Sequence, residues 1–228
     1  MGPDPPARAL PFVLSLIAGS TDTISFLGLN GLFTAHITGN VVILAAHLIT
    51  GDPAIVSYIL AVPVFMLVLL LTSLFANDLE RSGVATLRLL LSLQLLFLMG
   101  FLTLSVVYRA GVDSALAVVT GMIGVAAMAV QTALVQISLK GTPSTGVMTT
   151  NMTHFVVALA ELLARRDLSM AEMARRRMLH ILPVITGFVL GCALGAASEQ
   201  AWGLRSLALP TALALLALLL TRLPAPAN

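Results

Sequence analysis

The chain has 228 residues, of which 58% are hydrophobic and only 10% are charged, and its mean hydropathy is +1.02. A soluble domain carries about 25% charged residues, so this composition predicts that lipid covers most of the outer surface. The net charge of +2 is small, and no basic cluster with interleaved aromatic residues suggests a nucleic-acid-binding protein. The sequence therefore predicts an all-α integral membrane protein whose main partner is the lipid bilayer.

Apolar stretches of about 20 residues, the length that crosses a bilayer, recur along the chain. Spans two and six are the most polar, which makes them candidates for broken or re-entrant segments, so the number of crossing spans lies between six and eight. Gly, Pro and Asx turns separate most of the stretches. We predict about eight transmembrane helices, at about 11–29, 33–50, 54–76, 85–107, 114–138, 144–164, 178–198 and 204–222.

A basic loop at 165–177 sets the expected orientation, because it holds five of the twelve Lys and Arg residues. The positive-inside rule places such a loop in the cytoplasm. With eight spans, Arg8, Arg109 and Arg222 fall on the same side, which gives eight basic residues inside and four outside. We therefore expect a multi-pass protein of the plasma membrane with both termini cytoplasmic.

The two halves of the sequence resemble each other, which predicts a first membrane repeat at 1–110 and a second at 111–228. Residues 34–40 read T-A-H-I-T-G-N and residues 145–151 read T-G-V-M-T-T-N, while A-V-P-V at 61–64 corresponds to I-L-P-V at 181–184. Four crossing spans per repeat would make the repeats parallel, and one non-crossing span per half would make them inverted. Transporters use both arrangements, with the binding site at the repeat interface.

The first half carries one motif in four pieces: Gly19–Asp22, Phe26–Gly28, Phe33 and Thr38–Asn40. The second half carries a looser version in Val130–Ala133 and Thr149–Asn151, where Thr150 stands in the place of Gly39. These pieces resemble the signature of the YoaK-like family of bacterial multi-spanning membrane proteins, which is a domain of unknown function. The resemblance implies a bacterial inner-membrane protein and supplies neither a substrate nor an activity.

Polar side chains inside the predicted spans are the candidate functional residues, because each costs several kcal/mol in lipid unless it finds a partner. Asp22 suits a proton or cation site, or alternatively a cap on a neighbouring turn. His36, Asn40 and His47 share one helical face, and Gly39 would let the helix unwind and expose backbone groups. Tight packing through small residues is the alternative for this span.

Span six repeats this pattern with Asn151, His154 and Glu161 on one face, and we expect Glu161 to pair with Arg165 four residues on. Gln131 in span five is either a ligand or a hydrogen bond between helices. The predicted solute-binding or ion-binding residues are Asp22, His36, Thr38, Gly39, Asn40, Gln131, Thr149, Asn151 and His154.

The favoured function is a transporter or permease for a small solute, in which Asp22 or His36 could couple transport to protons, with its site between spans one, two, five and six. No metal-binding, redox or phosphate-binding motif occurs, so we predict no cofactor, no metal and no enzyme activity. The alternatives are a non-catalytic membrane scaffold, or an intramembrane enzyme with Asp22, His36 and His154 in one cavity. The sequence does not determine whether the protein forms a homo-oligomer.

Overall fold

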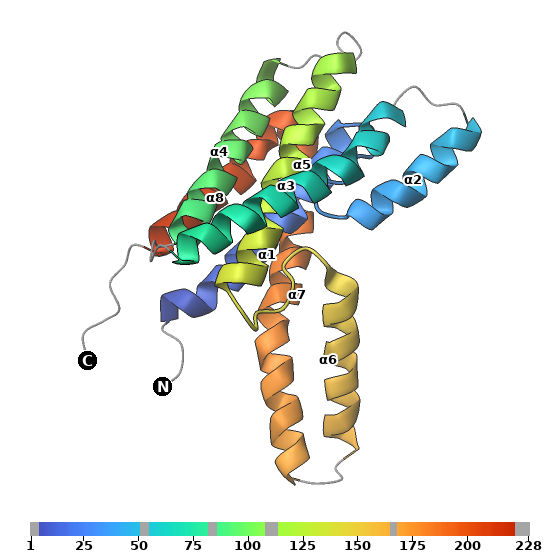
Figure 1. Ribbon diagram of the computed structural model, residues 1–228. Helices are drawn as coiled ribbons and strands as arrows, with labels where there is room; N and C mark the ends of the chain where they lie inside the picture. Colours follow the sequence, from blue (N-terminus) through green and yellow to red (C-terminus); the bar gives the residue numbers. More distant parts are fainter. Residues whose placement is uncertain (1–4, 51–54, 82–85, 108–113, 165–167, 222–228) are drawn as a thin grey trace.

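The computed structural model describes residues 5–50, 55–81, 86–107, 114–164 and 168–221, and these residues are almost entirely helical (Figure 1). No strand occurs among them. In chain order the elements are α1 (Pro5–Gly28), α2 (Ile37–Thr50), α3 (Ile55–Arg81), α4 (Thr86–Val107), α5 (Ser114–Ser138), α6 (Met148–Leu163), α7 (Leu168–Trp202), the 3₁₀-helix η1 (Gly203–Leu207) and α8 (Ala208–Leu220).

Within the described residues, five stretches are long and apolar enough to cross a membrane, and the last of them contains both α7 and α8. They are Ala9–Gly28, Ile55–Leu79, Thr86–Val107, Ala115–Ser138 and Ser169–Leu220. The predicted class, an all-helical protein compatible with several membrane passes, is confirmed at this level. The predicted eight separate spans are not, because α2 has 14 residues and α6 has 16, which is less than the ~20 that a crossing needs.

Large apolar side chains cover the outside of the helices. Val42 is 72% exposed, Ile49 89% and Leu163 72%. Soluble monomers rarely expose broad apolar surfaces to water, whereas a lipid-facing helix exposes such side chains without cost. The distribution of apolar side chains therefore agrees with the composition.

The helices α1 and α5 are the most buried of the candidate spans; α1 packs along α7, and α5 packs along both α3 and α4 (Figure 1). The helices α1 and α5 run in opposite directions. Gln131 in the second half of α5 reaches the carbonyl of Leu14 in the first half of α1, while Gly121 near the start of α5 lies against Leu32 just beyond the end of α1. Each short helix pairs with the long helix that follows it, α2 with α3 and α6 with α7, while α4 and α8 pack together along one side.

The contact between α1 and α7 is close enough that it requires glycine. Gly187, Gly191 and Gly195 recur every four residues and therefore share one face of α7. A Cβ atom at Gly191 would lie 2.5 Å from the carbonyl oxygen of Leu16, and one at Gly195 would lie 2.9 Å from that of Ser20. Residue numbers increase in the same direction along both helices at this contact, so α1 and α7 are parallel. Their backbones touch, as in small-residue packing of membrane helices.

Two segments differ from the sequence prediction. The basic segment at 165–177, predicted as a loop with a short helix in its middle at 168–173, is helical from Leu168 onward as the start of the long helix α7, and 165–167 lie outside the described residues. Glu172 pairs with Arg175 and Arg176 at helical spacing, which favours helix over loop.

The second difference concerns span two, predicted to begin at about 33. The helix begins at Ile37, so the helical structure is interrupted before the Thr-Gly-Asn motif and not at Gly39. Gly39 belongs to the first turn of α2, where its N–H donates to the carbonyl of His36 over 3.0 Å. An added Cβ there would lie 3.0 Å from the Phe33 ring, so the glycine makes room for this ring and does not unwind the helix.

Candidate functional site

Residues 29–36, which we name the first turn, connect α1 to α2 inside the protein. Gly31 adopts a φ of +86°, a left-handed conformation that costs glycine little. Asn40 closes the turn from α2 with two hydrogen bonds, since its Nδ2 donates to the carbonyl of Phe33 over 2.7 Å and its Oδ1 accepts the Phe33 N–H over 3.0 Å. Asn40 is fully buried, so it fixes the shape of the turn.

Asp22, in α1, lies beneath the first turn and is only 3% exposed. Its Oδ1 accepts the N–H of Thr34 over 2.8 Å, the Thr34 hydroxyl over 3.0 Å and the N–H of Ala35 over 2.6 Å. An anion in this place is favourable, because the start of α2 carries the positive end of the helix dipole. The carboxylate therefore fixes the backbone that leads into α2, from a helix earlier in the chain.

His36 occupies the other oxygen of the same carboxylate. Its Nδ1 lies 2.6 Å from Asp22 Oδ2, and because an ionised carboxylate only accepts, Nδ1 carries the proton. The imidazole lies between the rings of Phe33 and Phe188, with ring centroids 5.7 Å away in both cases. Its side chain is still 35% exposed, so a buried acid is joined to the outside through a titratable ring.

Residues 139–147, which we name the second turn, connect α5 to α6 in a similar way. Gly141 adopts a φ of +85°, and Asn151 of α6 donates from Nδ2 to the carbonyl of Ser144 over 2.7 Å. Gln131 of α5 donates from Nε2 to the Thr145 hydroxyl over 3.0 Å and to the Leu14 carbonyl of α1 over 2.9 Å. Its Oε1 accepts the side-chain amide of Gln94, in α4, over 2.7 Å.

The two turns share a construction and differ in one charge. In both, an asparagine near the start of the short helix donates its side-chain amide to the backbone carbonyl seven residues before it. In both, a polar side chain from the preceding long helix reaches a threonine hydroxyl, Asp22 in the first and Gln131 in the second. The turns also meet, because a Cβ at Gly146 would lie 3.6 Å from that of Ala35.

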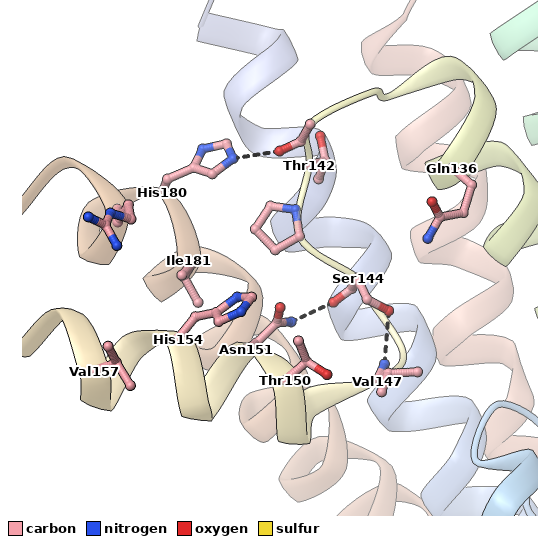
Figure 2. A pocket seen from close by; sticks show the side chains of 13 residues that line it. Gln136, Thr142, Ser144, Val147, Thr150, Asn151, His154, Val157, His180 and Ile181 are labelled. Carbon is pink, nitrogen blue, oxygen red and sulfur yellow. Dashed lines mark hydrogen bonds between the residues drawn. The ribbon is translucent and has the colours of Figure 1, made fainter. Parts of the chain in front are cut away.

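A cavity of about 630 Å³ opens beside the second turn, between α6 and α7 (Figure 2). His154 of α6 and His180 of α7 both line it, and the Nε2 of His180 lies 3.0 Å from the carbonyl of Gly141. Since a carbonyl only accepts, this nitrogen carries the proton and ties α7 to the turn. The remaining lining combines hydroxyl and amide groups with an apolar wall: Gln136, Gly141, Thr142, Pro143, Ser144, Val147, Thr150, Asn151, Val157, Arg177 and Ile181.

The structure thus separates the predicted residues into two groups. Asp22, His36 and Asn40 belong to the first turn, whereas Gln131, Asn151 and His154 surround the second. Thr38 and Thr149 lie at the starts of α2 and α6 and are exposed. Gly39 lies against Phe33, as described above.

The sequence did not predict every interaction at this site. Arg165, the predicted partner of Glu161, lies outside the described residues, so that pairing stays a prediction, while Glu161 pairs with Arg177 over 3.3 Å. This pairing connects two helices and could not be found from spacing along one. His180 was not predicted as a site residue, although a histidine three residues before the proline of the repeated x-x-P-V motif marks a polar position near the start of an apolar span.

The arrangement offers limited metal chemistry. Within the described ranges, no group of three or more His, Cys, Asp or Glu side chains could hold a metal ion. The intramembrane enzyme alternative needs Asp22, His36 and His154 in one cavity. Of these three, His154 lines the cavity, whereas Asp22 and His36 bond each other at the first turn.

Long apolar helices, joined in two places by polar turns of which one holds an acid–histidine pair, make this an all-helical protein compatible with several membrane passes. The chain belongs to the family described as "Protein of unknown function (DUF1275)", whose model matches residues 10–220. This membership agrees with the resemblance to a domain of unknown function that the motifs suggested. No curated protein and no solved structure matches the chain.

Proposed function

We propose that this chain is a transporter or permease for a small solute in a bacterial inner membrane, coupled to protons through Asp22 and His36. The observation that carries the proposal is the contact of the two polar turns at Ala35 and Gly146, the turns that lead from α1 to α2 and from α5 to α6. Interrupted helices that meet inside a membrane protein are the usual place of substrate and ion sites in secondary transporters.

The opposite directions of α1 and α5 support an inverted repeat. In our proposal α1 and α2 together form one interrupted span, as do α5 and α6, so each half crosses the membrane three times. An odd number of crossings inverts the second half relative to the first. The contacts agree with this relation, because α1 with α7 corresponds to α3 with α5, and α2 with α3 corresponds to α6 with α7.

Six crossings also give a stronger charge bias than eight. Nine basic residues then fall on the cytoplasmic side, two fall on the other side, and Lys140 lies in the second turn. The cytoplasmic nine are Arg8, Arg81, Arg88, Arg165, Arg166, Arg175, Arg176, Arg177 and Arg222, and the outer two are Arg109 and Arg205. By the positive-inside rule, this supports an orientation with both termini in the cytoplasm.

The orientation can be tested at the two ends of α7. With Cys192 replaced by Ser, Trp202→Cys should react with a membrane-impermeant maleimide in intact cells, and Met170→Cys only after lysis. Both positions are at least half exposed, so the comparison reports sidedness. Labelling of Met170→Cys in intact cells would refute the orientation.

The Asp22–His36 pair has the properties that a proton carrier needs. Asp22 is buried while His36 is partly accessible, and histidine titrates in the physiological pH range. The pair connects both elements that would have to move, because the Asp22 carboxylate is part of α1 and its partners belong to the first turn. Gain or loss of a proton would therefore change the bonds that hold the first turn to α1.

The test is solute-dependent proton movement in proteoliposomes that contain a pH-sensitive dye. Benzoate, benzamide and benzylamine are added singly, as an anionic, a neutral and a cationic probe. We expect at least one probe to change the internal pH faster in wild-type proteoliposomes than in protein-free liposomes, which report the passive entry of neutral benzoic acid or benzylamine. His36→Gln should abolish that difference, because Gln keeps the Asp22 contacts to Thr34 and Ala35 possible but cannot exchange a proton.

Thr153→Val is the matched control, since Thr153 lies on the exposed face of α6 and bonds only within its own helix in the described contacts. It should leave proton movement unchanged. Circular dichroism and thermal unfolding of each variant show whether the fold survives. Wild-type rates in a folded His36→Gln variant would refute proton coupling through this pair.

One observation favours the scaffold alternative. The buried polar groups of the first turn satisfy one another, as Asp22 and Asn40 do with the backbone of residues 33–35, and such bonds are also expected of purely structural polar residues. A protein that moves none of the three probes, although it is folded and correctly inserted, would favour a scaffold.

A further inference from the structure

The cavity beside the second turn has a chemistry that neither the motifs nor the family describes. We propose that it binds a small organic anion, a carboxylate attached to a short apolar body, as the solute of the transporter. This inference specifies the solute class and rests on the proposed function. It is carried by the charge of the lining, by the shape of the wall and by a comparison with the first turn.

The charged and titratable groups of the lining are all basic. Arg177 and His180 come from α7 and His154 comes from α6, and among the described lining residues none carries a carboxylate. The start of α6 also faces the cavity through Val147 and Thr150, which adds the positive end of a helix dipole. The Arg177 guanidinium would repel a cation, whereas a carboxylate would complement this guanidinium and could accept hydrogen bonds from the histidine N–H groups.

Glu161 shows what kind of group this edge of the cavity attracts. Its carboxylate lies 3.3 Å from the guanidinium of Arg177 and does not belong to the lining. The pair is partly exposed, with the Arg177 side chain 55% accessible, so the guanidinium can turn to a second carboxylate at little cost. Arginine suits this role because its planar fork binds carboxylates through two donors.

The apolar residues of the lining suit an apolar body. Pro143, Val147, Val157 and Ile181 line the cavity together with hydroxyl groups from the turn (Figure 2). A volume of about 630 Å³ falls within the range of small-molecule sites. Water alone would leave this apolar wall poorly solvated, whereas an aromatic or aliphatic carboxylate would cover it.

The first turn has aromatic side chains where the second has this histidine-lined cavity. Tyr58 of α3 is buried, donates its hydroxyl to the Asn30 carbonyl and stacks on His47 of α2 with ring centroids 5.0 Å apart. His180 of α7 makes the corresponding bond to the Gly141 carbonyl, and the cavity opens beside it. The first turn also has its own anion in Asp22, whereas the second has the neutral Gln131. The second turn thus lacks the internal carboxylate that the first turn contains.

The test is equilibrium binding of radiolabelled benzoate to the full-length protein in lipid nanodiscs. Unlabelled benzoate should compete fully, the neutral isostere benzamide at least roughly tenfold more weakly, and the cation benzylamine not detectably. His154→Ala and Arg177→Gln should each weaken benzoate binding by roughly tenfold, the loss expected for one hydrogen bond to a charged group. Equal competition by benzoate and benzylamine would overturn the anion assignment, as would the absence of saturable benzoate binding.

A space-filling variant locates the site. Val157→Phe places a ring in the cavity and should abolish benzoate binding, whereas Val42→Phe, on an exposed face of α2 outside the cavity, should leave it unchanged. Wild-type affinity in a folded Val157→Phe protein would overturn the location. Because binding needs no transport, benzoate that binds but enters proteoliposomes no faster than protein-free liposomes would refute the proposed function alone. Proton-coupled flux of benzamide without any benzoate binding would instead refute this inference alone.

Discussion

The two asparagines that close the turns provide a test with a built-in comparison. Asn40 makes two hydrogen bonds with the backbone of Phe33, one to each of its polar groups. Asn151 makes one with the backbone of Ser144, together with a weak contact of 3.8 Å to the sulfur of Met148. We expect Asn40→Ala to destabilise the protein more than Asn151→Ala, although the residue type and its place in the short helix are the same.

The magnitude follows from the groups left without partners. A buried backbone group that loses its only partner costs about 1–3 kcal/mol. Asn40→Ala leaves an N–H and a carbonyl beneath a fully buried side chain, so we expect a loss of about 4 kcal/mol. Asn151→Ala leaves one carbonyl at the edge of an open cavity, where water can replace the amide, so we expect a loss of about 1 kcal/mol.

The assay is reversible unfolding in mixed micelles, in which circular dichroism follows helix loss as the fraction of denaturing detergent rises. Asn40→Asp adds an intermediate step, because aspartate can still accept the Phe33 N–H but has no amide to donate to the carbonyl. If Asn151→Ala costs as much as Asn40→Ala, the number of backbone bonds does not determine the stability of the turns, and the reasoning fails.

Two further predictions concern the packing of the long helices. Gly191→Ala should lower the stability by about 1–3 kcal/mol, the usual penalty of overpacking, because its Cβ would meet the backbone of Leu16 at 2.5 Å. Gly100→Ala should be neutral or stabilising in the same unfolding assay, because its Cβ would make an ordinary contact of 3.6 Å with Ile123. Gln131→Leu should cost about 2–4 kcal/mol, since it removes bonds to Gln94, Leu14 and Thr145. A Gln131→Leu variant as stable as the wild type would show that these buried bonds contribute no net stability.

The sequence predicted the order and approximate position of every helix, because each depends on a local apolar stretch and a local turn signal. It predicted the position of the interruptions less well. The Thr-Gly-Asn motif suggested unwinding at Gly39, yet the turn ends before this glycine, because Asn40 reaches back to Phe33 and folds residues 33–36 onto the start of α2. Spacing along the chain cannot reveal a bond that a side chain makes to preceding backbone.

Contacts between distant helices were the least predictable part of the site. Asp22 was recognised as a candidate, and capping of a neighbouring turn was one of its two expected roles, but its partners Thr34 and His36 could not be chosen without the fold. His180 and Arg177 enter the cavity because α7 extends well before the apolar stretch that was predicted as span seven. Opposite charges at helical spacing, such as Glu172 and Arg176 four residues apart, were the available sign that this basic segment was helical.

The charge difference between the turns has a consequence for the proposed coupling. If both turns held a carboxylate, the two anions would lie in neighbouring parts of one buried region, where like charges raise each other's cost. With Gln131 in the position that corresponds to Asp22, only the first turn changes its charge when a proton arrives, and Gln131 keeps the second turn bonded to Leu14 of α1. We therefore expect Gln131→Glu to add a second titrating step to the pH dependence of proton movement. A Gln131→Glu protein that keeps the single step would contradict this reasoning, because the added carboxylate would then have no effect on the coupling.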